Sequence, residues 1–426
     1  MKISFVIPTR KNLKYFKWAY NSIRKNQGNN EVWICAADDA SGDGTAEYFE
    51  ELSKTDKQFK FLVNEGPERV GHTILYDRIV NELVETDAAI IWHADMYLCP
   101  GALDEVAIGL YGTAEEPKVE SAIVSLTRIE PPLHPPGPEK LIKDFGTEPE
   151  HFDEDALLNY ASEMAKIAVK NNKTQTSGIF APWAFMVQDF KSVHGHDPLF
   201  APQSKEDSDI FNKFFIDGIE LIQTWKGFVY HMTCRGSRFN PSITKVGQNS
   251  PEWTAQNVKS SRNFIRKWGH FVKHDNMMLP IVPNRYDIGI IIENANPSII
   301  EALEVWCSTL YCTTESDNPK IVDDYIAKEQ PNTLYDLNKR VKFIPRSDVD
   351  MHYTNACDCP HDVMVKLDAT QMNPDYANVI TNLSEILAES GQVGEMEFNM
   401  MQLKIDALKD YKFDLLKEQY NNSNIR

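Results

Sequence analysis

The first half of the chain alternates between short apolar runs and segments whose apolar residues recur every three or four positions. The runs are rich in β-branched and aromatic residues, and they predict strands at 2–9, 31–37, 59–64 and 88–93. The periodic segments predict helices at 12–26, 42–54 and 72–85. Strands that alternate with helices in this way favour an α/β fold with a mostly parallel central sheet flanked by helices.

The rest of the chain has the same α/β character. Further patterns predict strands at 121–129 and 179–188, helices at 156–172 and 204–218, and two short strands within 219–231. A proline-rich loop at 130–140 begins an insertion at about 130–175. A proline-rich linker near 279–285 separates a first domain, 1–280, from a second, smaller α/β domain, 285–426. The second domain is predicted to contain strands at 286–292, 340–345 and 362–368, helices at 297–311 and 376–390, and a long amphipathic helix from about Glu395.

Polar residues gather where the predicted strands of the first domain end. They are Thr9 and Arg10, Asp38 and Asp39, Asn64 and Glu65, and His93 and Asp95. Parallel sheets of this class bind ligands at the carboxyl ends of their strands. We therefore expect these side chains to lie along one edge of the sheet, at a ligand site.

Composition is typical of a soluble globular protein. The 426 residues are 42% hydrophobic and 25% charged, and no run of about 18 apolar residues predicts a membrane span. The formal net charge of -18 disfavours nucleic acid as a partner. Seven scattered cysteines without a secretory signal favour a cytoplasmic protein, with peripheral membrane attachment as a second expectation. Cys357, Cys359 and His361 could form a metal knuckle, but a second pair at zinc spacing is missing.

Two acidic clusters each have a plain structural interpretation. In ADDASGDGT, residues 37–45, Asp, Ser and Gly favour a turn that caps a helix. That interpretation leaves the adjacent carboxylates Asp38 and Asp39 unexplained, and such groups can accept hydrogen bonds from a base N–H or a ribose hydroxyl. In SKEDSD, residues 204–209, three acids at a helix start could stabilise the helix dipole.

Taken in order, several segments resemble a family 2 glycosyltransferase with the GT-A fold. They are FVIPT, DDASGDGT, NEGPERVG, IIWHADM, EDSDIFNKFFIDG and VYH, which together span roughly residues 1–239. The resemblance implies a nucleotide-sugar-binding fold. It also implies transfer of a sugar from a nucleoside diphosphate sugar, with a UDP-sugar as the expected donor, to an acceptor hydroxyl. We expect that hydroxyl on a glycan, a lipid-linked molecule or another compound.

The resemblance assigns donor contacts by position. In the family, the strand-end Thr and the second acid of the first pair contact the base, which implies Thr9 and Asp39 here. Tyr76 and Asp77 stand where the family often has an Arg-Asn pair. The two arginines after VYH would cover the diphosphate, or would be ordinary surface charge. The donor-binding residues expected from this comparison are Pro8, Thr9, Arg10, Asp38, Asp39, Asp77, His93, Ala94, Arg235 and Arg238.

The sequence HADM occupies the place of the family's Asp-X-Asp motif. Asp95 matches the last Asp, which ligates a divalent metal, and His231 matches a histidine that often closes the metal site. The resemblance therefore implies Mn²⁺ or Mg²⁺ held by these two residues. His93 stands where the first Asp usually lies, and a neutral imidazole can bind a ribose or ligate Mn²⁺ more naturally than Mg²⁺. A strand-end histidine and an N-cap aspartate are the structural alternatives.

The implied catalytic residues are Asp207 and Glu206. Asp207 matches the family's general base, which takes the proton of the acceptor hydroxyl as the new bond forms. Glu206 would raise the pKa of Asp207 through like-charge repulsion. A single displacement would invert the anomeric centre. Trp183 and Trp225 could stack on sugar rings or pack in the core.

Two other classes of protein compete with this interpretation. A nucleotidyltransferase should have a glycine-rich phosphate loop after the first strand, but PTRKNLKYF contains no glycine. A non-catalytic nucleotide-sugar-binding or scaffold protein would not need Asp95, Glu206, Asp207 and His231 together. The second domain is expected to bind the acceptor, a partner protein or a second subunit, so an oligomer through this domain is one expectation.

Overall fold

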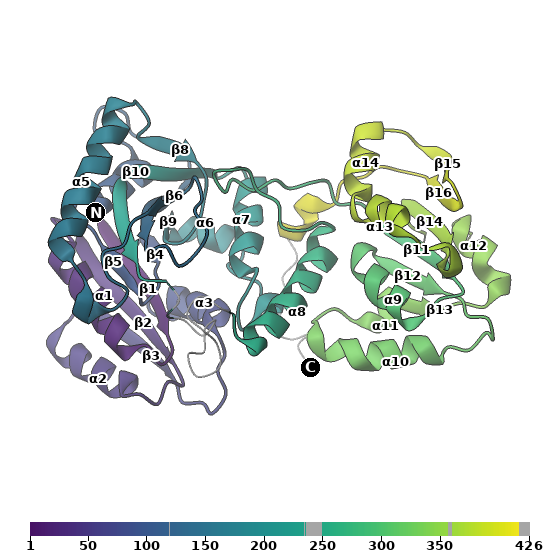
Figure 1. The fold of residues 1–426 in the computed structure, drawn as a ribbon, viewed down its shortest axis with the longest axis horizontal. Helices are drawn as coiled ribbons and strands as arrows, with labels where there is room; N and C mark the ends of the chain where they lie inside the picture. Colours follow the sequence, from purple (N-terminus) through teal and green to yellow (C-terminus); the bar gives the residue numbers. More distant parts are fainter. Residues whose placement is uncertain (119, 234, 236–248, 357–359, 417–426) are drawn as a thin grey trace. The chain divides into compact units, whose positions relative to one another are not determined.

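The computed structural model describes residues 1–118, 120–233, 235, 249–356 and 360–416. Internal contacts group the chain into two compact units (Figure 1). Unit 1 contains Met1–Asn257 and His274–Ile281, and unit 2 contains Val258–Lys273 and Val282–Arg426. Of the predicted features, Arg238 and the Cys357–Cys359 pair lie outside the described residues.

The centre of unit 1 is a ten-stranded sheet whose longest path has the order β3-β2-β1-β4-β9-β6-β10-β5. Its strands are β1 (Lys2–Thr9), β2 (Glu31–Asp39), β3 (Phe59–Asn64), β4 (Ala88–Ile91), β5 (Met96–Leu98), β6 (Ala122–Glu130), β7 (Leu141–Ile142), β8 (Gln175–Ser177), β9 (Trp183–Met186) and β10 (Glu220–His231). Strands β3, β2, β1 and β4 are parallel, as are β6 and β10, whereas β9, β5 and β8 pair antiparallel. The mostly parallel central sheet confirms the predicted fold class.

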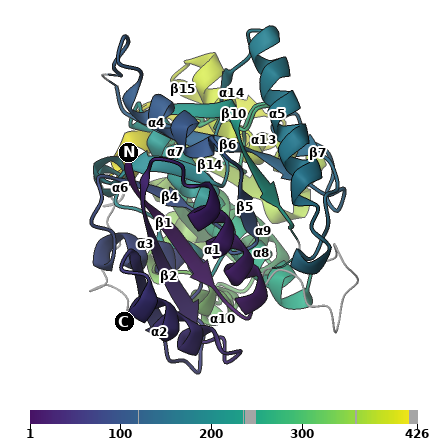
Figure 2. The ribbon, with the colours of Figure 1, turned by 90° about the vertical axis from the view of Figure 1, so that its left-hand side faces the viewer.

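Helices cover the sheet of unit 1. They are α1 (Leu13–Asn26), α2 (Thr45–Thr55), α3 (His72–Glu82), α4 (Ala102–Tyr111), α5 (Glu154–Lys170), α6 (Val187–Ser192) and α7 (Glu206–Ile216). A further helix, α8 (Pro251–Trp268), begins in unit 1, and its second half belongs to unit 2. Figure 2 shows α1 in front of β1 and β2, where its buried Phe16 joins the core of these strands. Phe16 lies 4.7 Å from the ring of Phe49 on α2, and Phe49 lies 5.4 Å from Phe59 on β3. None of the described helices is long and apolar enough to cross a membrane.

The strand register brings the polar strand ends of unit 1 together. Thr9 at the end of β1 pairs with Asp38 on β2, and Asp39 pairs with Asn64 at the end of β3. Parallel strands whose ends are level place their following loops at one edge. The sequence prediction of a shared polar edge is therefore confirmed for these strands.

Among the details of unit 1 that differ from the sequence prediction, two concern strands β10 and β5. The two short strands expected within 219–231 form one strand, β10, whose pairing with β6 shifts between Thr224 and Phe228. The shift lets one strand continue where the pattern is interrupted by Lys226 and Gly227. Strand β5 was not predicted, because three residues are too few to establish an alternating pattern.

Unit 2 contains a six-stranded sheet with the order β13-β12-β11-β14-β16-β15. Its strands are β11 (Ile288–Glu293), β12 (Thr309–Cys312), β13 (Val341–Phe343), β14 (Val363–Asp368), β15 (Gly394–Phe398) and β16 (Met401–Ile405). Its main helices are α9 (Pro297–Leu303), α10 (Lys320–Glu329), α11 (Leu337–Arg340), α12 (Val349–Tyr353), α13 (Pro374–Thr381) and α14 (Leu383–Ser390). Strands β11 to β14 pair in parallel, and the last two form an antiparallel hairpin.

The predicted helix from about Glu395 is wrong, because this segment forms the hairpin of β15 and β16. Met401, Leu403 and Ile405 are buried at every second position, which is the period of a strand. The turn is made at Asn399, whose φ of 55° suits asparagine. The predicted helix at 297–311 is also too long, since α9 ends at Leu303 and β12 follows.

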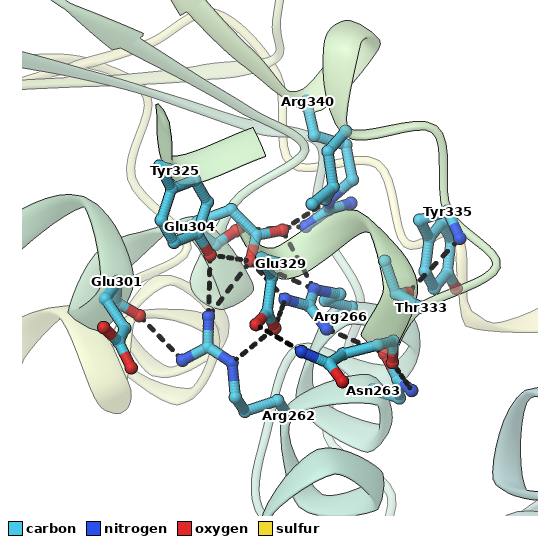
Figure 3. A network of polar contacts seen from close by, with 12 residues as sticks. Arg262, Asn263, Arg266, Glu301, Glu304, Tyr325, Glu329, Thr333, Tyr335 and Arg340 are labelled. Atoms are coloured by element: carbon cyan, nitrogen blue, oxygen red, sulfur yellow. Dashed lines mark hydrogen bonds and ion pairs between the residues drawn. The ribbon is translucent and has the colours of Figure 1, made fainter. Parts of the chain in front are cut away.

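A buried network of charged side chains holds the second half of α8 within unit 2 (Figure 3). Arg266 on α8 contacts Glu304 at 2.7 Å and Glu329 at 2.6 Å, and neither the Arg266 nor the Glu304 side chain is exposed. Arg340 on α11 reaches Glu304 at 2.9 Å. Arg262, one turn before Arg266, contacts Glu329 at 2.9 Å. Every charge at the centre of this network therefore has an opposite charge in contact.

Candidate active site

One cavity of about 580 Å³ opens at the carboxyl edge of the unit 1 sheet. Its wall includes the ends of β1, β2 and β10, the segment after β4 and the start of α7. The predicted site residues that line it are Pro8, Thr9, Arg10, Asp39, His93, Ala94, Asp95, Glu206, Asp207 and His231. Residues separated by almost 200 positions in the sequence, such as Asp39 and His231, thus face the same space.

Asp39 lies at one end of this wall, and the backbone fixes its carboxylate. One oxygen accepts hydrogen bonds from the Val70 N–H at 2.9 Å and from the Asn64 side chain at 2.8 Å. The other oxygen accepts from the Gly71 N–H at 2.9 Å. The Thr9 hydroxyl is buried and has no hydrogen-bond partner among the described residues. A fixed acceptor beside an unsatisfied hydroxyl suits a polar heterocycle or a ribose.

Cationic side chains line the same cavity, and sequence reasoning identified only Arg10 among them. The others are Arg69, Arg128, Lys140 and Lys205. Burial, together with the nearby positive charge of Arg10, lowers the pKa of Arg69. The two arginines therefore lie close enough to repel each other. An anion bound between them would reduce this repulsion. Arg69 is part of NEGPERVG, but nothing in that pattern distinguishes it from a surface arginine.

His93, Asp95 and His231 form a candidate metal site. Among the residues that the structure describes, these three offer ligand atoms that all lie within 4.8 Å of one another. His231 Nε2 is 3.4 Å from Asp95 Oδ1, and the two imidazole rings are 5.5 Å apart. Burial and the neighbouring His231 lower the pKa of His93 to about 3. His93 is therefore neutral at physiological pH, as a metal ligand must be.

Glu130, at the end of β6, contacts His231 of the candidate metal site. It is only 2% exposed, and its carboxylate contacts His231 Nδ1 at 2.8 Å, Lys140 at 2.9 Å and Arg128 at 3.4 Å. Burial alone would raise the pKa of Glu130, but Arg128, His231 and Lys140 hold it well below its usual range. An ionised carboxylate on Nδ1 leaves Nε2 of His231 directed toward Asp95.

The electrostatic surroundings of His231 and Asp95 match this arrangement. Burial would lower the pKa of His231, but Asp95 and Glu130 outweigh it and raise the pKa to about 9. Burial would raise the pKa of Asp95, but the charge of His231 lowers it. The two groups therefore attract each other as an ion pair, and a bound cation would take the place of the imidazolium proton.

Glu206 and Asp207 begin α7 inside the cavity. Glu206 Oε1 contacts His72 Nε2 at 2.6 Å, where His72 is the first residue of α3. Burial would raise the pKa of Glu206, but His72 lowers it, so Glu206 carries the negative charge. Burial and the charge of Glu206 raise the pKa of Asp207 to about 6. Sequence reasoning foresaw the effect of Glu206 but missed His72, which has no motif around it.

The structure does not bring three of the predicted donor-binding residues to the cavity wall. Asp38 precedes Asp39 on the same strand, points to the other face, and accepts from the Ser41 N–H at 3.3 Å. Asp77 accepts hydrogen bonds from His196, whose Nδ1 is 2.8 Å away. Arg235 instead contacts the Thr147 carbonyl and Glu148, each at 3.1 Å.

Neither tryptophan suggested for sugar stacking lines the cavity. Trp183 is fully buried in the core, and Trp225 donates its indole N–H to Thr176 at 2.9 Å. Trp253 of α8 lines the cavity instead. Sequence reasoning missed it because the segment around it has no motif and lies beyond the predicted strands.

No protein-family model matches this chain, and no curated protein sequence matches it. Solved structures with a similar fold include S. aureus TarS 1–349 in complex with UDP-GlcNAc, which is 15% identical with a TM-score of 0.40, over 62% of this chain and 66% of that chain. They include the mannosyltransferase PcManGT from Pyrobaculum calidifontis with GDP-Man and Mn²⁺, which is 15% identical with a TM-score of 0.37, over 54% of this chain and 56% of that chain. GalNAc-T7 with UDP, GalNAc and Mn²⁺ is also 15% identical, with a TM-score of 0.42, over 62% of this chain and 48% of that chain. The chain thus spans about half to two thirds of these three structures.

Proposed function

We propose that the protein is a metal-dependent glycosyltransferase that moves a sugar from a nucleoside diphosphate sugar to an acceptor hydroxyl. The observation that carries the proposal is the convergence of Asp39, Asp95, His231 and Asp207 on one cavity. These residues supply, in order, a hydrogen-bond acceptor for the nucleoside, two metal ligands and a base whose pKa is raised. These four residues lie within the sequence motifs that resemble family 2 glycosyltransferases with the GT-A fold. The motifs therefore support the same assignment.

The donor is proposed to bind with its nucleoside at Asp39 and Thr9. The fixed carboxylate of Asp39 would accept the ring N–H of a base such as uracil, and a UDP-sugar is the expected donor. The Thr9 hydroxyl would gain the partner that it lacks among the described residues. Arg10 and Arg69, which repel each other, would lie along the diphosphate.

The residues present fit a divalent cation. Two imidazole nitrogens and a carboxylate are a donor set suited to Mn²⁺, and Mg²⁺ is the alternative. Glu130 supplies the carboxylate that orients a metal-bound histidine. When bound, the cation would stabilise the negative charge that develops on the leaving nucleoside diphosphate. His231 and Asp95 would hold it, with His93 as a third ligand or as a ribose contact.

Asp207 is proposed to act as the general base. The acceptor oxygen would form a bond to the anomeric carbon while the bond from that carbon to the diphosphate oxygen breaks. The hydroxyl proton would pass to Asp207, whose pKa of about 6 leaves it ionised at neutral pH yet basic enough to accept a proton. A single displacement of this kind inverts the anomeric centre. Glu206, held by His72, keeps a negative charge beside the base.

The proposed partners and location follow the same assignment. The acceptor would be a glycan, a lipid-linked molecule or another hydroxyl compound, and a cytoplasmic protein is proposed, with peripheral membrane attachment as the alternative. An oligomer through unit 2 is also proposed. The net charge of -18 continues to disfavour nucleic acid.

The proposal is tested by measuring what the protein releases from a panel of nucleotide sugars, including UDP-glucose, UDP-galactose, UDP-N-acetylglucosamine and GDP-mannose, with and without Mn²⁺. Nucleoside diphosphate should appear only with the cation. Asp207→Asn should lower the rate by roughly 10²- to 10⁴-fold. The matched control is Asp217→Asn at the exposed other end of α7, which should leave the rate unchanged. Pyrophosphate release from a nucleoside triphosphate and a sugar phosphate would indicate a nucleotidyltransferase, and no release at all would indicate a binding or scaffold protein.

A further inference from the structure

One face of α8 reaches the cavity and the segment that leads to Asp207. Trp253, Gln256 and Asn257 are spaced i, i+3 and i+4, so they lie on the same side of the helix. Trp253 lines the cavity, while Gln256 and Asn257 contact residues 201–205. All of these residues belong to unit 1. Neither the sequence motifs nor the proposed chemistry gives this helix face a role.

The segment held by α8 has an unfavourable backbone conformation. Ser204 has φ of 80° and Lys205 has φ of 71°, although neither is a glycine. Such conformations are uncommon for these residue types and persist only where the surroundings enforce them. Ser204 and Lys205 come directly before Glu206 and Asp207, and all four line the cavity. The backbone path of these two residues therefore determines where the proposed base enters the cavity.

In each hydrogen bond from α8, the donor and the acceptor can be assigned. The Gln256 side-chain amide donates to the Gln203 carbonyl at 3.2 Å and to the Ala201 carbonyl at 3.4 Å. The Asn257 side-chain carbonyl accepts from the Ser204 hydroxyl at 2.8 Å and from the Lys205 ammonium at 3.1 Å. Carbonyl groups cannot donate and an ammonium group cannot accept, so the partners fix which end of each amide faces them.

We infer that Gln256 and Asn257 are positioning residues for the acceptor side of the site. By holding Ser204 and Lys205 in the left-handed conformation, they place Asp207 where it can take the acceptor proton. This inference rests on the proposed function, in which Asp207 is the base. It adds that catalysis depends on a donor at position 256 and an acceptor at position 257, two adjacent residues with opposite requirements.

The opposite requirements allow a test that a general loss of packing would not satisfy. Asn257→Asp keeps the accepting oxygens, whereas Asn257→Leu has a similar size and removes them. Gln256→Glu keeps the shape of the side chain and removes the donor. We expect Asn257→Leu and Gln256→Glu to lower kcat by roughly 10- to 100-fold, as a misplaced base would. Asn257→Asp should recover most of the rate. The KM for the donor should stay within about twofold in all three, because Asp39 is held by Asn64, Val70 and Gly71, which none of the variants replaces.

Two further measurements accompany the rates. Ala255→Gln, on the exposed side of the same helix turn, is the matched control and should behave as the parent protein. Amide hydrogen exchange over residues 201–207 should be faster in Asn257→Leu and Gln256→Glu, and normal in Asn257→Asp. Equal rates and equal exchange in all variants would overturn the inference, as would a loss in Asn257→Asp as large as in Asn257→Leu. Failure of the proposed function looks different, because the parent protein itself would then release no nucleoside diphosphate while the exchange pattern would still respond to the variants.

Discussion

At the scale of single residues, the pKa of Asp207 leads to a testable pH dependence. Burial and Glu206 raise this pKa to about 6, while His196, His72 and Arg128 act in the opposite direction. A general base works only when it is ionised, so kcat/KM should rise with pH through about 6 and level off above it. A pH–rate profile of nucleoside diphosphate release from pH 4.5 to 8 measures this directly.

Glu206→Gln provides the internal check on that profile. The substitution removes the neighbouring negative charge, and the amide can still hydrogen-bond His72. The midpoint should therefore move to lower pH. A profile with the same midpoint in both proteins would mean that another group controls the reaction.

Glu130 leads to a second prediction at this scale. Its carboxylate orients His231 through Nδ1, and loss of such a partner typically weakens metal binding by roughly 10- to 100-fold. Glu130→Gln should show this loss in a titration that follows free Mn²⁺ by electron paramagnetic resonance. Glu139→Gln is the control, because Glu139 lies 3.8 Å from the same Arg128 and is not one of the candidate ligands. Equal Mn²⁺ affinity in Glu130→Gln and the parent protein would exclude this role.

The site residues that could be predicted from the sequence differ from those that could not in what brings them to the site. Thr9 and Asp39 end strands, Asp95 follows one and Asp207 lies at the start of a helix, and all four lie in the motifs that carry the family resemblance. Glu130 reaches the site only because β6 and β10 pair in parallel with Ile129 opposite Tyr230, which brings the next residue on each strand together. No local pattern contains that register.

At the scale of elements, the turn before α3 is a sensitive point. Gly71 has φ of 88°, its N–H binds Asp39, and a Cβ there would lie 2.2 Å from the Pro202 carbonyl oxygen. Gly71→Ala should therefore displace both the nucleoside end of the cavity and the segment before Asp207. We expect UDP binding, measured by isothermal titration calorimetry, to weaken by at least about tenfold, since this is the effect of losing only 1.4 kcal/mol.

Gly101→Ala is the control that distinguishes the effect of the close contact at Gly71 from the effect of backbone strain. Gly101 has φ of 78°, similar to that of Gly71, but a Cβ there would meet nothing within 4 Å. This variant should lose some stability and keep its affinity for UDP. Equal UDP affinity in Gly71→Ala and Gly101→Ala would contradict the role given to the Gly71 turn.

The elements themselves were predictable where one pattern continued for a whole strand or helix. Strands β1, β2 and β4 have this property, since each is buried over most of its length. The segment from Gly394 to Ile405 does not, because a short hairpin places apolar residues at spacings that also fit a helix. Pairing of β16 with β14 decides between the two, and this is a tertiary interaction.

At the scale of the whole molecule, the buried network of unit 2 predicts where stability is concentrated. Glu304 has no exposed side-chain surface and contacts Arg266 and Arg340. Glu304→Gln would leave these buried guanidinium groups short of negative charge, and breaking a buried ion pair costs roughly 3–5 kcal/mol. The free energy of unfolding in urea should fall by about that amount. Glu301→Gln, which removes an exposed contact to Lys328 at 3.0 Å, should change it by less than about 1 kcal/mol.

The central claim is that Asp39, Asp95, His231 and Asp207 surround one nucleoside diphosphate and its cation. A crystal structure of the protein grown with UDP and Mn²⁺, with manganese located by its anomalous scattering, tests this most directly. The account predicts manganese bound by Asp95 and His231 and uracil in contact with Asp39. It also predicts that Asp207 faces the end of the diphosphate to which the sugar would be attached. Manganese at another site, or UDP bound away from Asp39 and Asp95, would contradict it.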